Sequence, residues 1–159
     1  MIKNKTNIGF SLIELLIVIA IIILLGIISV VALSSQQASA RDARRISDIR
    51  QIRTALEFYS SDESQYPVLD QPIVLGGSDS AKLCSKAEGS FVSEKTECKT
   101  ETTYMAKVPQ DPLSNQKYSY IGSKKGYDIT FTTEKASSLG KAGTYHAHSD
   151  VIDQQAGVR

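Results

Sequence analysis

A single acidic residue interrupts the longest apolar run of the chain. Glu14 lies near the start of residues 10–33, a stretch of 24 residues dominated by Ile, Leu, Val and Ala. A carboxylate inside a membrane helix costs about 2.5–3.5 kcal/mol to insert, so an acid kept there is expected to have a function and a charged partner. The alternative is an acid close enough to the helix end to reach the lipid headgroups. Glu14 is therefore the first candidate for chemistry in this sequence.

The run around Glu14 has the length of a membrane anchor. A helix of 24 residues rises roughly 36 Å at about 1.5 Å per residue, which exceeds the roughly 30 Å of a bilayer core. It is too long for the apolar region of a secretory signal peptide, about 7–15 residues, and no small-residue cleavage site closes it. The sequence therefore predicts a retained transmembrane helix over residues 10–33.

A short basic leader precedes this helix. In the segment from Lys3 to Ala20, Gly9 stands directly before Phe10, and Glu14 is the fifth residue after Gly9. This segment resembles the class III signal of type IV pilins and of the pseudopilins of type II secretion. The resemblance implies that a prepilin peptidase cuts between Gly9 and Phe10 and methylates the new amine of Phe10. It also implies a homo-oligomeric filament, built at an inner-membrane assembly platform, in which Glu14 attracts the N-terminal ammonium of a neighbouring subunit.

The same resemblance implies where the chain resides. Before assembly it would be a single-pass protein of the inner (cytoplasmic) membrane with its C-terminal domain extracytoplasmic, and afterwards part of a cell-surface or periplasmic filament. One pattern points the other way, because Arg41, Arg44 and Arg45 outnumber Lys3 and Lys5, and basic residues favour the cytoplasmic side. The expected divisions are the leader at 1–9, the transmembrane helix at 10–33, its amphipathic continuation at 34–62 and a globular head at 63–159.

The continuation of the helix is apolar on one side only. Apolar residues recur at spacings of three and four, which is typical of an amphipathic helix packed on a sheet. The arginines between them are interpreted as a solvated face mixed with acids, or as contacts to acids of adjacent subunits. Nucleic acid is an unlikely partner, because no aromatic residues are interleaved for stacking. The apolar positions are Ala43, Ile46, Ile49, Ile52, Leu56 and Tyr59, and the arginines are Arg41, Arg44, Arg45, Arg50 and Arg53.

Beyond the helix the sequence predicts a small antiparallel sheet. Residues 117–121 and 126–132 read as a hairpin joined by 122–125, and alternation of apolar and polar residues in the second strand indicates a half-buried strand. Residues 143–148 add one more strand. Residues 68–103 are expected to be a loop-rich connector with at most a short helix around 80–84. The fold class is therefore α+β, with a long N-terminal helix packed on a small antiparallel β-sheet.

The two cysteines lie in that connector. A bond between Cys84 and Cys98 would close a 15-residue loop, worth about 3 kcal/mol in the chain-entropy model. Cysteines confined to the exported part favour an oxidising compartment. The alternative is two reduced thiols, and zinc is unlikely because the chain has no CxxC pair.

No set of residues predicts catalysis, so the protein is not expected to be an enzyme. His146 and His148 could share a strand face as metal ligands, but no third ligand is identifiable, so no metal site is assigned. No cofactor is expected either. Calcium remains open, with Asp150 and Asp153 as ligands beside Asp128 or Glu134, as in the C-terminal loop that secretion pseudopilins have.

The function predicted from the sequence is that of a structural subunit of a type IV pilus-like filament. Net charge is +1 for the whole chain, and the leader contributes more than that, so composition demands no anionic partner. The first alternative is a pseudopilin of a type II secretion system, with slight preference given to the pilus because no calcium loop is clear. An alternative of another class is an uncleaved, membrane-anchored extracytoplasmic binding protein.

Overall fold

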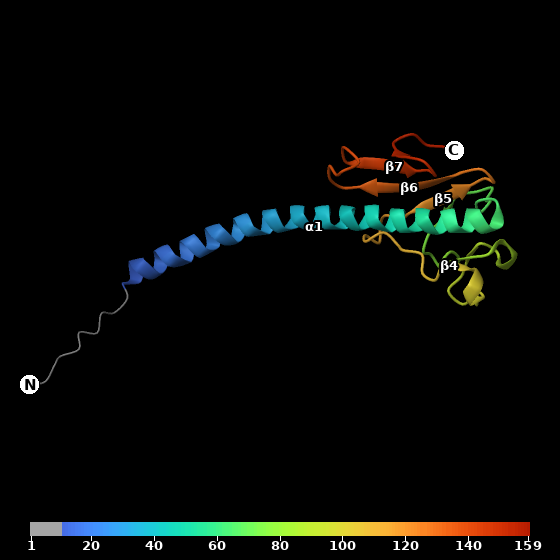
Figure 1. Cartoon of the computed structure of the whole chain (residues 1–159). Coiled ribbons are helices and arrows are strands. Elements are labelled where there is room, and N and C mark those ends of the chain that lie inside the picture. The colour runs from blue at the N-terminus through green and yellow to red at the C-terminus, as the bar shows by residue number, and fades with distance from the viewer. Residues whose placement is uncertain (1–10) are drawn as a thin grey trace, which may run out of the picture. The chain divides into compact units, whose positions relative to one another are not determined.

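One long helix opens the structure. The computed structural model describes residues 11–159, without the side chains of residues 28–32 and 100. Helix α1 (Leu12–Glu63) is continuous over 52 residues (Figure 1). It starts where the carbonyl of Ser11 accepts the backbone N–H groups of Glu14 and Leu15, and it ends before Ser64, which has a left-handed φ of 56°. The predicted helix, residues 10–33 with its continuation at 34–62, is therefore confirmed as a helix within the described range and ends one residue later, at Glu63.

The chain divides into two compact units, one ending at Gln37 and the other beginning at Ala38. In the first unit the large apolar side chains from Leu12 to Ile27 are all exposed, Leu12 to 81%. Within the residues that the structure describes, no helix has the length and apolar character that a membrane crossing requires. The span predicted over residues 10–33 is not confirmed by this finding, and the leader, residues 1–9, lies outside the described residues.

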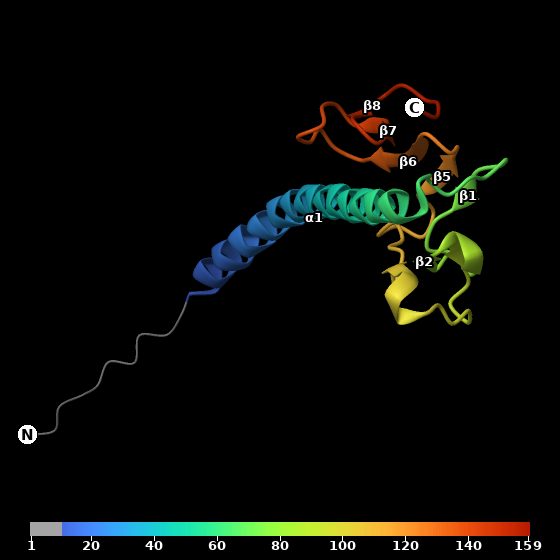
Figure 2. The ribbon, with the colours of Figure 1, turned by 45° about the vertical axis from the view of Figure 1, so that its right-hand side comes forward.

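The second unit contains two antiparallel sheets, which lie on different sides of the C-terminal part of α1 (Figures 1 and 2). Sheet A has the order β1-β5-β6-β7-β8, and sheet B has the order β3-β2-β4. Two short 3-10 helices, η1 (Lys86–Glu88) and η2 (Thr100–Thr102), flank the strands of sheet B. The strands are β1 (Ile73–Val74), β2 (Lys82–Cys84), β3 (Phe91–Val92), β4 (Thr103–Met105), β5 (Ser119–Gly122), β6 (Tyr127–Thr133), β7 (Gly143–Ala147) and β8 (Ile152–Asp153).

The predicted hairpin is present. Strands β5 and β6 pair with Ser119 opposite Thr130 and Tyr120 opposite Ile129, and β7 adds the third predicted strand along β6. Alternation holds on the inner face, where Tyr127, Ile129 and Phe131 are at most 1% exposed. The sheet is nevertheless larger than predicted, because β1 and β8 extend both edges by two residues each.

The short helix predicted around residues 80–84 is wrong. Residues 82–84 form β2, the central strand of sheet B, in which Leu83 lies opposite Phe91 on one side and Met105 on the other. These partners lie 8 and 22 residues away along the chain. A strand of three residues is too short to show a period of two, and its position depends on pairing with these partners. The local sequence pattern therefore could not identify it.

The core of the head is built from one face of α1 and the tyrosines of sheet A. Ile49, Leu56 and Tyr59 are fully buried, as the apolar stripe predicts, whereas Ala43 is exposed, which corrects that part of the prediction. They belong to one core cluster with residues of both sheets, including Tyr118, Tyr120 and Tyr127. Full burial of an Ile or Leu side chain contributes about 1.5–3 kcal/mol, so this face holds the helix against the sheets.

Candidate functional site

Glu14 lies in the first turn of α1. Its side chain is exposed, and none of the ion pairs in the described part of the chain includes it. The helix macrodipole favours a carboxylate at this end by about 0.3–1 kcal/mol. Glu14 is therefore held in place by the helix but keeps its charge available for a cation of another molecule. Gly9 and Phe10 lie outside the described residues, so cleavage and methylation there stay predictions.

The surface around Glu14 is apolar and exposed. From Leu12 to Ile27 the large apolar side chains on every side of α1 are between 44% and 81% exposed. A monomeric soluble protein rarely exposes a contiguous apolar area beyond a few hundred Å², and a larger one marks contact with protein or lipid. This part of α1 is therefore built to be covered by something outside the chain.

Further along α1, within the head, a buried arginine joins three segments. The Arg45 side chain is 0% exposed, and its guanidinium makes a bidentate contact with Asp111, with Nε–Oδ2 at 2.7 Å and Nη2–Oδ1 at 2.8 Å. Its Nη1 donates to Asp42 Oδ1 at 2.6 Å and to Glu134 Oε1 at 2.7 Å. The pKa of Arg45 is raised, chiefly by the hydrogen bond to Asp111. This network, here called the Arg45 cluster, consists of Arg41, Asp42, Arg45, Asp111 and Glu134.

Each carboxylate of the Arg45 cluster has several donors. Asp42 also accepts the backbone N–H groups of Glu134 and Lys135 at 2.7–3.1 Å. Glu134 accepts Nε and Nη2 of Arg41, and these bonds are the main reason that its pKa is lowered to about 2. The cluster thus ties α1 to the turn that carries Asp111 and to the segment after β6, which fixes the head on the helix.

This cluster corrects the interpretation of the arginines. Arg45 is buried and Arg41 is bound to Glu134 of the same chain, so neither belongs to a solvated face. Arg44, at 66% exposure, and Arg50 do remain on the surface, as interpreted. The local pattern could not separate the two kinds, because Asp111 and Glu134 lie 66 and 89 residues from Arg45.

A buried acid beside the cluster uses a tyrosine as its donor. The hydroxyl of Tyr118 donates to Asp48 Oδ2 at 3.0 Å, and both side chains are buried. Burial raises the pKa of Asp48 and also that of Tyr118. Asp48 is one of the acids between the arginines of α1, which were interpreted as a solvated face, so its burial corrects that interpretation. Its spacing of three residues from Arg45 puts these two side chains on one helix face and was the available signal.

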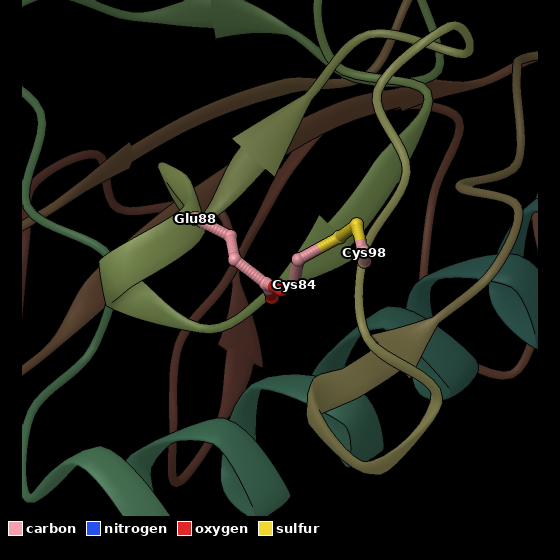
Figure 3. Close-up of side chains that lie close together, drawn as sticks. All are labelled: Cys84, Glu88 and Cys98. Atoms are coloured by element: carbon pink, nitrogen blue, oxygen red, sulfur yellow. A yellow bond between two sulfur atoms is a disulfide. The ribbon is translucent and has the colours of Figure 1, made fainter.

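Cys84 and Cys98 are joined in a disulfide, with their Cα atoms 6.0 Å apart. The Glu88 side chain extends toward the bond (Figure 3) and accepts hydrogen bonds from the Lys99 N–H, the Thr102 hydroxyl and Ser85. The bond from Lys99 is the main cause that lowers the pKa of Glu88 to about 2.

The disulfide between Cys84 and Cys98 and the hydrogen bonds of Glu88 thus stabilise the same loop. Among the described residues, Cys84, Glu88 and Cys98 are the one group of three side chains spaced for a metal ion, and the disulfide occupies both sulfurs.

The two histidines and the acids considered as calcium ligands each make contacts of their own. His146 Nδ1 is 2.9 Å from Asp128 Oδ1, whereas both ring nitrogens of the buried His148 face backbone carbonyls at 3.1 Å. Glu134 binds arginines, and Asp153 contacts Arg159 at 3.2 Å. Within the described part of the chain, the structure therefore does not gather these residues into one set of ligands.

Most of the chain is similar to known proteins. A family model described as type II secretion system (T2SS), protein G, matches residues 32–153. The chain belongs to the T2SS protein G family. Its match excludes the leader and Glu14, so it supports the resemblance noted in residues 3–20 independently, and that resemblance is confirmed. No solved structure gives a significant match.

Individual relatives agree with the T2SS protein G family. The type II secretion system core protein G of Vibrio cholerae is 28% identical over 144 residues, which cover 89% of this chain and 90% of that protein. The core protein G of Pseudomonas aeruginosa is 27% identical, covering 80% and 83%. That of Escherichia coli is 26% identical, covering 86% and 85%. The filament-subunit prediction is compatible with these matches, which favour its type II secretion alternative over the pilus.

Proposed function

We propose that this chain is a pseudopilin, a cofactor-free structural subunit that polymerises into the filament of a type II secretion system. Prepilin peptidase removes the leader between Gly9 and Phe10 and methylates Phe10, and an inner-membrane platform adds the subunit to the filament. The observation that carries the proposal is the T2SS protein G match over residues 32–153 together with the exposed apolar part of α1. The extracytoplasmic location of the head is supported by the bond between Cys84 and Cys98.

The apolar part of α1 suits a helix that passes from lipid into a bundle of equal helices. Cleavage creates an ammonium on Phe10, four residues before Glu14. Two such charges about 4 Å apart attract by about 4 kcal/mol at an effective dielectric of 20, before the cost of desolvation. Pairing between neighbouring subunits therefore sets the register of assembly, and apolar packing supplies most of the binding energy.

The test is Glu14→Leu in the full chain, with Glu14→Gln as the matched variant that keeps shape but not charge. Both should insert and be cut, because the peptidase contacts the leader and the junction, and both should fail to polymerise efficiently. Mass spectrometry of the N-terminus should show chains that begin at methylated Phe10. Gly9→Val provides the uncut control, since a β-branched side chain crowds the scissile backbone.

Two results would contradict the proposal. Wild-type chains that keep residues 1–9 in cells would support the uncleaved binding protein instead. Filaments of Glu14→Leu as abundant as those of wild type, without intact subunits present, would remove the charge pairing and leave Glu14 as an acid at headgroup level.

A further inference from the structure

Two hollows lie beside α1 in the head. The larger, about 720 Å³, is lined by the cations Arg44, Lys82 and Lys107, and also by Glu94 and by Asp111, which is bound to Arg45. The smaller, about 410 Å³, is lined by Arg50, Phe58 and Tyr104 among others. The smaller lies between α1 and β4, whereas the larger meets α1 only at Arg44 and is otherwise lined by residues of 76–82, by residue 94 and by residues 106–112.

Cations line the part of this side nearer the N-terminus of the helix. Arg44 is 66% exposed and its nearest acid, Asp48, is 3.8 Å away. Arg50 and Lys107 are exposed, and neither takes part in an ion pair of the described residues. These three side chains, here called the basic patch, differ from Arg41 and Arg45, whose charges are neutralised within the chain.

Two acidic residues lie at the C-terminal end of α1. Asp62 and Glu63 close α1, where no basic residue compensates the negative end of the helix dipole. Neither acid has a basic side chain as partner among the described ion pairs, although Glu63 accepts the backbone N–H of Lys86. Burial and the nearby charge of Asp62 raise the pKa of Tyr104 to about 12. Asp62 and Glu63 are here called the acidic patch.

An apolar contact lies between the two patches. Phe58 is 63% exposed on α1, beside Tyr104 and Met105 across the smaller hollow. Aromatic side chains surrounded by charges are typical of the centre of a protein–protein contact. The side of α1 thus carries, in order, positive charge, an aromatic centre and negative charge.

We infer that this side of α1 docks a second copy of the chain, with the acidic patch of one subunit against the basic patch of a subunit farther along the filament. The inference rests on the proposed function. Contact between two different patches of one molecule is head-to-tail, and when it does not close into a ring it continues into a filament. Residues 44 and 62 are 18 positions apart, so the patches meet between two parallel helices offset by roughly 27 Å. This is a different pair of subunits from the one that Glu14 and Phe10 join, because those residues are only four positions apart and set an offset of roughly 6 Å.

The test reverses charge on each patch in the full chain, expressed with its own assembly machinery. Arg44→Glu with Arg50→Glu, and Asp62→Lys with Glu63→Lys, should each lower filament yield about tenfold or more. Combining all four changes should restore it, because the opposite charges meet again. The matched control reverses Lys124 and Lys125, two exposed cations of the β5–β6 turn, and should polymerise like wild type.

A second measurement does not depend on variants. In wild-type filaments assembled from mixed ¹⁴N and ¹⁵N subunits, a zero-length carbodiimide should link Lys107 of one copy to Asp62 or Glu63 of another. Unchanged filaments in the Arg44/Arg50 variant, or no rescue by the fourfold variant, would overturn the inference and leave the proposed function intact. Absence of any filament in wild type would instead refute the proposed function.

Discussion

Replacing Arg45 by Met should destabilise the head more than any other single arginine substitution in the basic segment of α1. The change removes a fully buried guanidinium and leaves Asp111, whose side chain is 1% exposed, and Asp42, at 3%, without their main cation. Removing one partner of a buried ion pair costs about 3–5 kcal/mol, because the remaining charge stays desolvated. For a protein of this size, that corresponds to a fall in melting temperature of about 6–20 °C.

The assay is chemical denaturation of the full chain in detergent, followed by circular dichroism. Arg44→Met is the matched control, since Arg44 is next in sequence but 66% exposed, and its free energy of unfolding should change by less than about 1 kcal/mol. Arg45→Lys keeps the charge but cannot form the bidentate contact with Asp111, so its loss should be intermediate.

A double-mutant cycle completes the test. Asp111→Leu together with Arg45→Met removes both members of the bidentate pair and should recover part of the stability lost in Arg45→Met alone. A loss below about 1 kcal/mol in Arg45→Met would show that the Arg45 cluster does not hold the head, and the structural reasoning would be refuted.

Three further predictions concern the head. The pKa values of Glu88 and Glu134 are lowered to about 2 from 4.5. The stability that these two carboxylates contribute should therefore be complete above pH 4.5 and lost as the pH falls toward 2. Denaturation at several pH values should show this loss, and the loss should be smaller in the Glu→Gln variants. Cys84→Ser should lower the free energy of unfolding by about 3 kcal/mol under oxidising conditions and by much less in excess reductant, and equal stability of both proteins without reductant would contradict it. Gly122→Ala should cost about 1–3 kcal/mol, because a Cβ there meets both the Tyr120 hydroxyl and the backbone carbonyl of Pro67, and a thermal denaturation curve equal to that of wild type would contradict it.

The elements that a local pattern specifies were predictable. The apolar spacing of Ile46, Ile49 and Leu56 located the buried face of α1, and the alternation around Ile129 located β6. Both patterns arise within a few residues, because a helix turn and a strand pleat repeat over short distances. The helix and the hairpin therefore followed from the sequence.

What depends on distant pairing was not predictable. Strand β2 is defined by partners in β3 and β4, and its three residues carry no period of their own. The Arg45 cluster likewise depends on Asp111 and Glu134, which meet α1 only after both sheets have formed. The candidate site at Glu14 could be predicted from the sequence because a single acid within a long apolar run is recognisable without knowledge of the fold.

Arg44 and Arg45 show why neighbouring residues of one type can have separate functions. Successive residues of a helix point about 100° apart, so the two arginines leave α1 on different sides. Arg45 is buried and contacts three carboxylates of its own chain. Arg44 lines an open hollow, and its ion-pair partner, Asp48, is 3.8 Å away. Loss of Arg45 should therefore appear as lost stability of each subunit, and loss of Arg44 as lost contact between subunits whose fold is intact.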